Sequence, residues 1–434
     1  MSVGRPTGGR GEEMYALLAE LFPLDRSLTG EGVRETLARL AQLVPLEVHE
    51  VPSGTRVLDW SVPPEWNVRE AWVRDPSGRK VVDVAKSNLH LVGYSVPVHG
   101  HMSLSELREH LHTLPEQPDV IPYRTSYYHE DWGFCLRHRD LEGLPGGEYE
   151  VLVDSSLEEG TLTYGECYLE GDVPDEVLLS CHVCHPSLAN DNLSGIVVAA
   201  HAARELARMP RRLSYRILFV PGTIGAITWL ARNRTTVSQI RHGLVLSCLG
   251  DPGAFTYKRS RRGDAAVDRA VAHVLGSLDG THEIRGFTPL GYDERQYCSP
   301  GFDLPVGRLT RTPNGEYPEY HTSADDLSLV RAEALAGSLH TLLRIVDVLE
   351  KDRTWVNQSP YGEPQLGRRG LYRAMGGAPD LPDLQTALLW VLNLADGEHS
   401  LLEVAERSGL DLAVLDAAAR LLADHDLLEE SPSG

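Results

Sequence analysis

One loop, residues 181–195, constrains this chain more than any other segment, because it gathers metal-binding side chains between a strand and a helix. Residues 176–180 read as a buried strand, and residues 196–209 have the apolar spacing of a helix. The loop therefore lies where a strand of an α/β sheet ends, which is where such proteins place their ligand sites. Its nitrogen and oxygen ligands suit zinc. They are His182, His185 and Asp191.

The rest of the chain divides into segments of different character. Two Leu-rich helices precede short alternating runs with turn signals, and apolar runs then alternate with amphipathic stretches, as in a sheet covered on both faces. A stretch rich in Gly, Pro and Arg leads to three helix-like segments. We expect an α/β protein with five parts: N-terminal helices of the catalytic domain over 1–50, an inserted β-rich domain over 51–165, the catalytic domain over 166–352, a linker over 353–382 and a winged-helix-like unit over 383–434.

The charge of the chain argues against two classes of partner. There are 41 Lys and Arg against 62 Asp and Glu, a net charge of −21. Such a surface repels phosphate, so we expect no nucleic-acid partner and no membrane partner. No stretch approaches the roughly 20 apolar residues of a membrane span, and the first residues lack an apolar signal core. Six scattered cysteines indicate reduced thiols, and we expect a cytoplasmic protein.

The C-terminal unit resembles the winged helices that commonly bind DNA, but its charge argues against that role. Residues 381–434 carry eleven Asp and Glu against Arg407 and Arg420. Its Leu-rich helical faces must be buried, either on the catalytic domain or on a second copy of the chain. We therefore expect a structural or protein-contact role and a homo-oligomer.

A second polar motif lies far along the chain, where Tyr320-His321-Thr322 precedes a long helix. Together with Asn190-Asp191-Asn192-Leu193-Ser194-Gly195, it resembles the two best-marked motifs of the co-catalytic zinc aminopeptidases, in the same order. The resemblance implies a zinc-aminopeptidase-like (phosphorylase/hydrolase-like) mixed sheet flanked by helices. It also implies that the first segment supplies a His ligand and a metal-bridging Asp, and the second segment a His ligand.

The chain is still more similar to an uncharacterised aminopeptidase-like family that combines such a domain with an insertion and a C-terminal winged helix. The motifs that carry this resemblance are Cys184-His185-Pro186-Ser187, Thr223-Ile224-Gly225 and Asp293-Glu294-Arg295-Gln296. The resemblance covers nearly the whole chain.

These resemblances make Asp191 and His321 the firmest ligands of one zinc ion. The strand alignment favours His182 as the first histidine, and the Cys-His-Pro signature favours His185. Two positions apart on an extended backbone, both can face the same way. We favour His185 and keep His182 open. Cys248 or Asp251 stands near the place of a further ligand in the family.

The chain departs from the zinc aminopeptidases at one strand end. Those enzymes carry adjacent glutamates there, one as general base and one as ligand, whereas this chain reads Pro221-Gly222-Thr223. The base must then come from another segment. We expect Glu294, with Glu130, Glu316 and Glu319 as alternatives, and we expect Asp293, Arg295 and Tyr320 to bind substrate.

The expected activity is zinc-assisted hydrolysis of a small peptide or amide, and tailoring of a metabolite is as plausible as peptide turnover. The alternative is a pseudoenzyme that keeps the metal loop without a base. Cys181-His182-Val183-Cys184-His185 also matches the Cys-x-x-Cys-His pattern of covalent haem attachment. Haem attachment requires an exported chain, so buried structural cysteines are the simpler interpretation.

Overall fold

The computed structural model describes residues 8–371 and 382–431. The chain forms two compact units. The first comprises residues 1–268 and 275–342, and the second comprises residues 269–274 and 343–434. Each unit is described by itself below.

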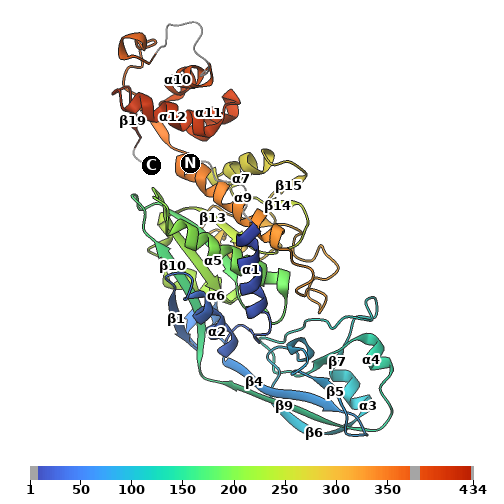
Figure 1. The fold of residues 1–434 in the computed structure, drawn as a ribbon. Coiled ribbons are helices and arrows are strands. Elements are labelled where there is room, and N and C mark those ends of the chain that lie inside the picture. Colours follow the sequence, from blue (N-terminus) through green and yellow to red (C-terminus); the bar gives the residue numbers. More distant parts are fainter. Residues whose placement is uncertain (1–7, 372–381, 432–434) are drawn as a thin grey trace. The chain divides into compact units, whose positions relative to one another are not determined.

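Eight strands form the central sheet of the first unit (Figure 1). In order across the sheet they are β1 (Glu47–Pro52), β10 (Thr161–Leu169), β12 (Ser214–Val220), β11 (Glu176–His182), β13 (Ile240–Leu246), β16 (Val306–Thr310), β14 (Phe255–Lys258) and β15 (His282–Arg285). The middle strands β12, β11, β13 and β16 are parallel, and antiparallel pairs join β10 to β12 and β14 to β16. Every residue of β11 and β12 is buried, as is typical of parallel strands covered on both faces. This confirms the mixed α/β fold expected from the sequence.

Helices pack on this sheet. α5 contacts β11, β12 and β13, and α1 lies beside α5, whereas α8 packs against β16 and α6. The carboxyl ends of the parallel strands are flanked by the loops that lead into α5, α6 and α8. Outside the insertion, the α-helices up to residue 351 are α1 (Gly8–Leu21), α2 (Glu31–Leu40), α5 (Gly195–Leu206), α6 (Ile224–Arg232), α7 (Ala266–Gly276), α8 (Glu294–Tyr297) and α9 (Ala332–Lys351).

The insertion forms its own antiparallel sheet in the order β5-β4-β9-β6, seen below the central sheet in Figure 1. Its boundaries differ from the expected 51–165, because β1 and the whole of β10 pair within the central sheet. The inserted residues are therefore 53–160. Its elements are β2 (Arg56–Val57), β3 (Trp60–Ser61), β4 (Glu65–Arg74), β5 (Lys80–Asp83), β6 (Val98–Ser103), α3 (Leu104–Leu107), β7 (Leu111–His112), β8 (Phe134–Cys135), α4 (His138–Glu142) and β9 (Glu148–Glu158).

Among its described residues, the second unit holds parts of α7 and α9, the helices α10, α11 and α12, and a three-stranded sheet of order β18-β17-β19. Its elements are β17 (Thr354–Asn357), α10 (Pro382–Leu394), β18 (Asp396–Ser400), α11 (Leu401–Ser408), α12 (Leu412–Ala423) and β19 (Leu428–Glu430). The segment expected as a linker, 353–382, thus begins with a strand of this sheet, and its residues 372–381 lie outside the described part of the chain. A local sequence signal starts α11, where Ser400 and Glu403 form a capping box.

No helix among the described residues is long and apolar enough to cross a membrane. All six cysteines are buried and carry free thiols.

Candidate metal centre

The loop that follows β11 is held in shape by hydrogen bonds to its backbone. The Asp325 carboxylate accepts the backbone N–H groups of Asn190 (2.6 Å) and Asp191 (3.0 Å). The Asn192 amide donates to the backbone oxygens of His182 (3.3 Å) and Leu246 (3.1 Å). These bonds fix the direction in which the Asp191 side chain leaves the loop.

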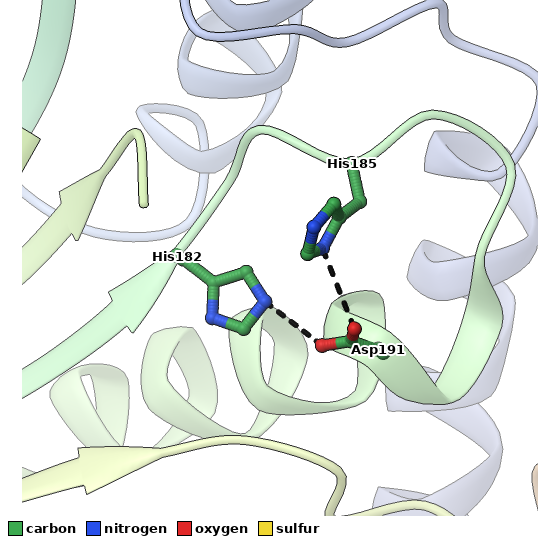
Figure 2. A group of neighbouring side chains, drawn as sticks. All are labelled: His182, His185 and Asp191. Atoms are coloured by element: carbon green, nitrogen blue, oxygen red, sulfur yellow. Dashed lines mark hydrogen bonds and ion pairs between the residues drawn. The ribbon is translucent and has the colours of Figure 1, made fainter. Parts of the chain in front are cut away.

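The Asp191 carboxylate is fully buried and lies among three histidines. Its Oδ1 is 2.9 Å from His182 Nε2, and its Oδ2 is 3.6 Å from His185 Nδ1 (Figure 2). The same Oδ2 is 3.0 Å from His321 Nε2. The structure therefore brings together all four residues expected as ligands, although His321 lies far from the others in sequence.

These residues fit a zinc ion. Two zinc–ligand bonds of about 2.0–2.1 Å in a tetrahedral arrangement put the ligand atoms roughly 3.3 Å apart, close to the distances from Asp191 to the three histidines. The ligand atoms of His182, His185 and Asp191 also lie within 4.8 Å of one another. His185 Nδ1 is buried and finds no hydrogen-bond partner among the described residues. A buried ring nitrogen without a partner is costly unless it binds something. A metal ion at Asp191 would satisfy it.

The electrostatics of the cluster also favour metal-binding protonation states. Burial lowers the pKa of His185 to about 3, so its ring is neutral at neutral pH and can offer a lone pair. Burial alone would raise the pKa of Asp191, but the surrounding His185, His182 and His321 hold it well below its usual range. Asp191 is therefore a carboxylate, the form that binds a cation.

The hydrogen bonds of His182 distinguish it from His185. The Cys248 N–H donates to Asn192 Oδ1 (3.2 Å), which identifies Asn192 Nδ2 as the amide donor. That Nδ2 lies 3.3 Å from His182 Nδ1, as well as 3.3 and 3.1 Å from the backbone oxygens of His182 and Leu246. In the tautomer whose Nδ1 accepts from Asn192, His182 Nε2–H donates to Asp191 Oδ1 and orients it. In the other tautomer His182 Nε2 offers its lone pair to a metal.

The insertion contributes to the site. Tyr123 N–H donates to the backbone oxygen of His321 (2.8 Å), and an antiparallel bridge joins Pro122 to Thr322. The Tyr123 ring meets the rings of His185 and His321 edge-on, at centroid distances of 5.3 and 5.1 Å. Residues 121–123 thus hold His321 in place.

Two further tyrosines contact the histidines. Tyr320, expected to bind substrate, stacks on the His321 ring at 3.9 Å. Tyr292, which the sequence interpretation did not select, lies over the His182 ring at the same centroid distance. The walls of the site are therefore largely aromatic.

Backbone strain is concentrated around the site. Thr223, Cys248 and His321 have φ values of 62°, 49° and 54°, in the left-handed region that residues with a side chain rarely adopt. Such residues cost about 1–3 kcal/mol each and cluster at functional sites.

The strand end that carries glutamates in the zinc aminopeptidases is filled by Tyr292. A Cβ atom added at Gly222 would overlap the Tyr292 hydroxyl. The Gly222 N–H donates to Cys184 Sγ at 3.1 Å, and the Tyr292 hydroxyl lies 3.8 Å from the same sulfur. Gly222 is thus required for close approach of Tyr292, and a glutamate cannot be placed here without moving that ring.

We expect Gly222→Ala to displace Tyr292 from its position over His182. Overpacking of this kind costs about 1–3 kcal/mol. The free energy of unfolding from denaturant titration should fall by that amount. The matched control is Gly286→Ala, where an added Cβ meets open space and φ is not positive. An unchanged stability in Gly222→Ala would contradict the packing described here.

Asp293 approaches the same strand end from the start of α8. Its Oδ1 accepts the Thr223 N–H at 2.7 Å, and its buried Oδ2 has no partner among the described residues. Burial raises the pKa of Asp293 to about 7. The neighbouring Arg295 is exposed. The chain therefore does present a carboxyl group at this strand end, supplied by α8 instead of by β12.

Glu294, which we expected to be the general base, lies in a different environment. It is fully buried and forms an ion pair with Lys258 Nζ at 2.5 Å, with Arg308 Nη1 at 3.9 Å. Both carboxylate oxygens also accept the Tyr292 N–H, at 3.2 and 3.1 Å. The Glu294 carboxylate is thus occupied by the Lys258 ammonium and by the backbone of its own loop. The geometry therefore favours a positioning role, in which Glu294 holds the loop that carries Tyr292.

We expect Glu294→Gln to act on stability. Removing one partner of a buried ion pair leaves an unpaired charge, here on Lys258, and costs about 3–5 kcal/mol. Thermal unfolding monitored by circular dichroism should show the loss. The exposed pair of Arg69 and Asp154 is the control, since Asp154→Asn should leave the unfolding temperature close to that of the parent.

Of the alternative ligands and bases named from the sequence, Cys248 contacts the Asp191 carboxylate. Cys248 Sγ is 4.0 Å from Asp191 Oδ1. Asp251 instead accepts from the Asn190 amide (3.1 Å) and supports the loop. Glu130 is exposed, Glu316 pairs with Arg285, and Glu319 is half-buried.

Comparison with known proteins agrees with this architecture. The profile of DUF4910, a domain of unknown function, matches residues 15–352, and that of a winged helix-turn-helix matches residues 353–430. A Clostridium acetobutylicum protein with the provisional name polysaccharide biosynthesis protein with aminopeptidase-like domain is 48% identical over 419 residues, 96% of each chain.

Two solved structures are also similar. The crystal structure of a provisionally named peptidase from Clostridium acetobutylicum has a TM-score of 0.90 at 46% identity, covering 98% of this chain and 97% of that one. BSAP, a zinc aminopeptidase from Bacillus subtilis, shares the fold at a TM-score of 0.57 and 13% identity, over 77% of this chain and 94% of its own. This chain belongs to the DUF4910 family, with an aminopeptidase-like fold followed by a winged helix.

Proposed function

We propose that this protein is a zinc-dependent hydrolase of the aminopeptidase type that acts on a small peptide or amide. The observation that carries the proposal is the buried Asp191 carboxylate, with His185 Nδ1 and His321 Nε2 on its Oδ2 side. The names of the relatives support the reaction class, since one has an aminopeptidase-like domain and a fold neighbour is a zinc aminopeptidase.

We assign one zinc ion to His185, Asp191 and His321. His182 is assigned to the orienting role, in the tautomer whose Nε2–H donates to the other oxygen of Asp191. Carboxylate and histidine partners of this kind fix the orientation of a ligand. Zinc, when bound, polarises a carbonyl group and lowers the pKa of water.

The proton transfer is assigned to Asp293. A general base works best when its pKa is near the working pH, and burial places that of Asp293 at about 7. Its unpartnered Oδ2 leaves one oxygen available to accept a proton. Tyr292 complements it, because burial raises the pKa of its hydroxyl well above the usual range and keeps it a hydrogen-bond donor. Arg295 and Tyr320 remain proposed substrate contacts.

The substrate class follows from the chemistry and from one relative. A fold neighbour is named a zinc aminopeptidase, which supports cleavage of an amide bond, and the relative named for polysaccharide biosynthesis suggests N-acylated amino sugars beside small peptides. The test is a panel of aminoacyl amides, dipeptides and N-acyl amino sugars, with turnover measured before chelation, after chelation and after zinc is restored. Turnover that vanishes and returns supports the hydrolase.

The second candidate is a pseudoenzyme that binds zinc without catalysis. It is favoured by the loss of the glutamate pair at Gly222 and Thr223. Zinc binding without turnover of any amide on the panel would support it over the hydrolase.

We also propose that the C-terminal unit does not bind DNA. In a helix-turn-helix the second helix enters the major groove and needs basic or polar side chains. Here α12 carries one Arg, Arg420, and that guanidinium pairs with Asp416 at 2.9 Å. Salt-sensitive binding of duplex DNA by the full chain would contradict this assignment.

A further inference from the structure

Two cations are buried on the face of the sheet that α8 covers. The antiparallel register of β14 and β16 places Lys258 opposite Arg308, so both side chains lie on the same face. Lys258 is 5% exposed and Arg308 is 9% exposed. The one carboxylate paired with both is Glu294. Together the three residues carry a net charge of +1.

The two cations use their hydrogen-bond capacity very differently. Lys258 Nζ contacts Glu294 at 2.5 Å and donates to the backbone oxygens of Thr288 (3.0 Å) and Leu290 (2.7 Å), which uses all three of its N–H groups. Arg308 makes one side-chain hydrogen bond, from Nη1 to Asn314 Oδ1 at 3.3 Å, and approaches Glu294 only to 3.9 Å. Its Nε is buried without a partner among the described residues.

A guanidinium has five N–H donors, and burying it without acceptors is costly. The charge and the donors of Arg308 are therefore available to a further anionic group. The Arg308 side chain keeps 10% of its exposure, on atoms other than the buried Nε.

Arg308 lies close to the metal centre. Asn314 links the two, because its Oδ1 accepts from Arg308 and its Nδ2 donates to Asp191 Oδ1 at 3.4 Å. The Arg308 guanidinium is thus two hydrogen bonds from the carboxylate that we assign to zinc. A group bound at Arg308 would be within a few bonds of an amide held at the metal centre.

We propose that Arg308 forms an anion subsite that binds a carboxylate of the substrate beside the hydrolysed amide. The planar fork of arginine matches a carboxylate with two parallel N–H donors. The substrate class is accordingly an acidic amide, such as an N-acyl amino acid or a peptide with a free carboxylate near the cleaved bond. This inference rests on the proposed hydrolase function for the position of the amide, and its test is a binding measurement.

The experiment compares two probes that differ by one negative charge, N-acetylglycine and N-acetylglycinamide, by calorimetric titration of the zinc-loaded full chain. Charge-assisted hydrogen bonds of the Arg308 type correspond to a preference for the acid of about 10- to 100-fold. Arg308→Gln should remove most of that preference and leave the affinity for the neutral amide unchanged. Any attraction of the acid to zinc is common to parent and variant, so their difference isolates Arg308.

The control is Arg285→Gln, since Arg285 is a more exposed arginine that pairs with Glu283 and Glu316. It should keep the parental preference. Where Arg308→Gln does not fold, Arg308→Lys replaces it, and the acid preference should fall because lysine lacks the fork. Equal affinity of the parent for the two probes, failure of the acid to bind, or a full preference in the Arg308 variant would overturn the subsite.

The same titration after chelation separates this inference from the proposed function. A preference that depends on Arg308 in a protein without amide turnover would support the subsite and count against the hydrolase. Turnover of neutral and acidic amides at equal rates, with equal binding, would support the hydrolase and count against the subsite.

Discussion

Substitution of Asp191 by Ala should abolish zinc binding and, with it, any amide hydrolysis. Asp191 is the residue that all three histidines face, at 2.9, 3.6 and 3.0 Å, so its removal leaves the imidazoles without the charge that gathers them. Loss of a partner that merely orients a ligand weakens zinc binding about 10- to 100-fold, and loss of Asp191 should exceed that. Zinc affinity measured by competition with a coloured chelator gives the number.

The matched control for this substitution is Asp326→Ala. Asp326 belongs to the same distal segment as Asp325 but bonds to Ser328 at its own turn. Its zinc affinity should equal that of the parent. Parental zinc affinity in Asp191→Ala would show that the metal centre is assigned to the wrong residues.

The second large effect is expected for Asp293→Asn. If Asp293 accepts the proton, its removal should lower turnover by about 10²- to 10⁴-fold while zinc stays bound. A base must be ionised to act, so the rate in the parent should rise with pH through the pKa of Asp293, about 7, and be lost below it. That pH limb should disappear in Asp293→Asn. Steady-state rates between pH 5 and pH 9 measure both effects.

Comparison with Glu294→Gln tests the assignment further. Glu294→Gln should lose stability but keep a rate per folded molecule close to that of the parent. Asp293→Asn should lose rate but keep nearly the stability of the parent. The reverse pattern would return the base to Glu294 and contradict the role drawn from its ion pair with Lys258.

Much of the fold and of the ligand set could be predicted from sequence, because the signals are local. His182, His185 and Asp191 lie in one short loop between a buried strand and a helix, and His321 belongs to a motif with a recognisable family order. The strand and helix periods around them are regular. The structure places the four residues of these motifs around one carboxylate, and their binding of zinc stays a prediction.

The choice between Asp293 and Glu294 could not be made in the same way. Successive residues at the start of a helix point about 100° apart, so one of two adjacent acids can face a strand end while the other faces inward. Here Asp293 meets the Thr223 N–H and Glu294 meets Lys258. A single sequence does not predict which cation will pair with a given carboxylate, because that partner comes from a distant segment of the chain.

Contacts from distant segments escaped prediction for a related reason. Tyr123 reaches the site from the insertion and Tyr292 from the loop before α8, and neither has a spacing that marks it. Gly222 gave a sequence signal for the contact with Tyr292, since a glycine at a strand end indicates close approach of another group. The expected insertion, 51–165, includes the first part of β10 because alternation identifies a strand but not the sheet that it joins.

The central claim is that zinc binds between His185, Asp191 and His321, and anomalous diffraction at the zinc edge from crystals of the zinc-loaded protein tests it most directly. The account predicts one peak, about 2.0–2.1 Å from His185 Nδ1 and His321 Nε2 and bound by Asp191 Oδ2. A zinc peak bound by His182 and Cys248 on the other side of Asp191, or no peak at this loop, would contradict it.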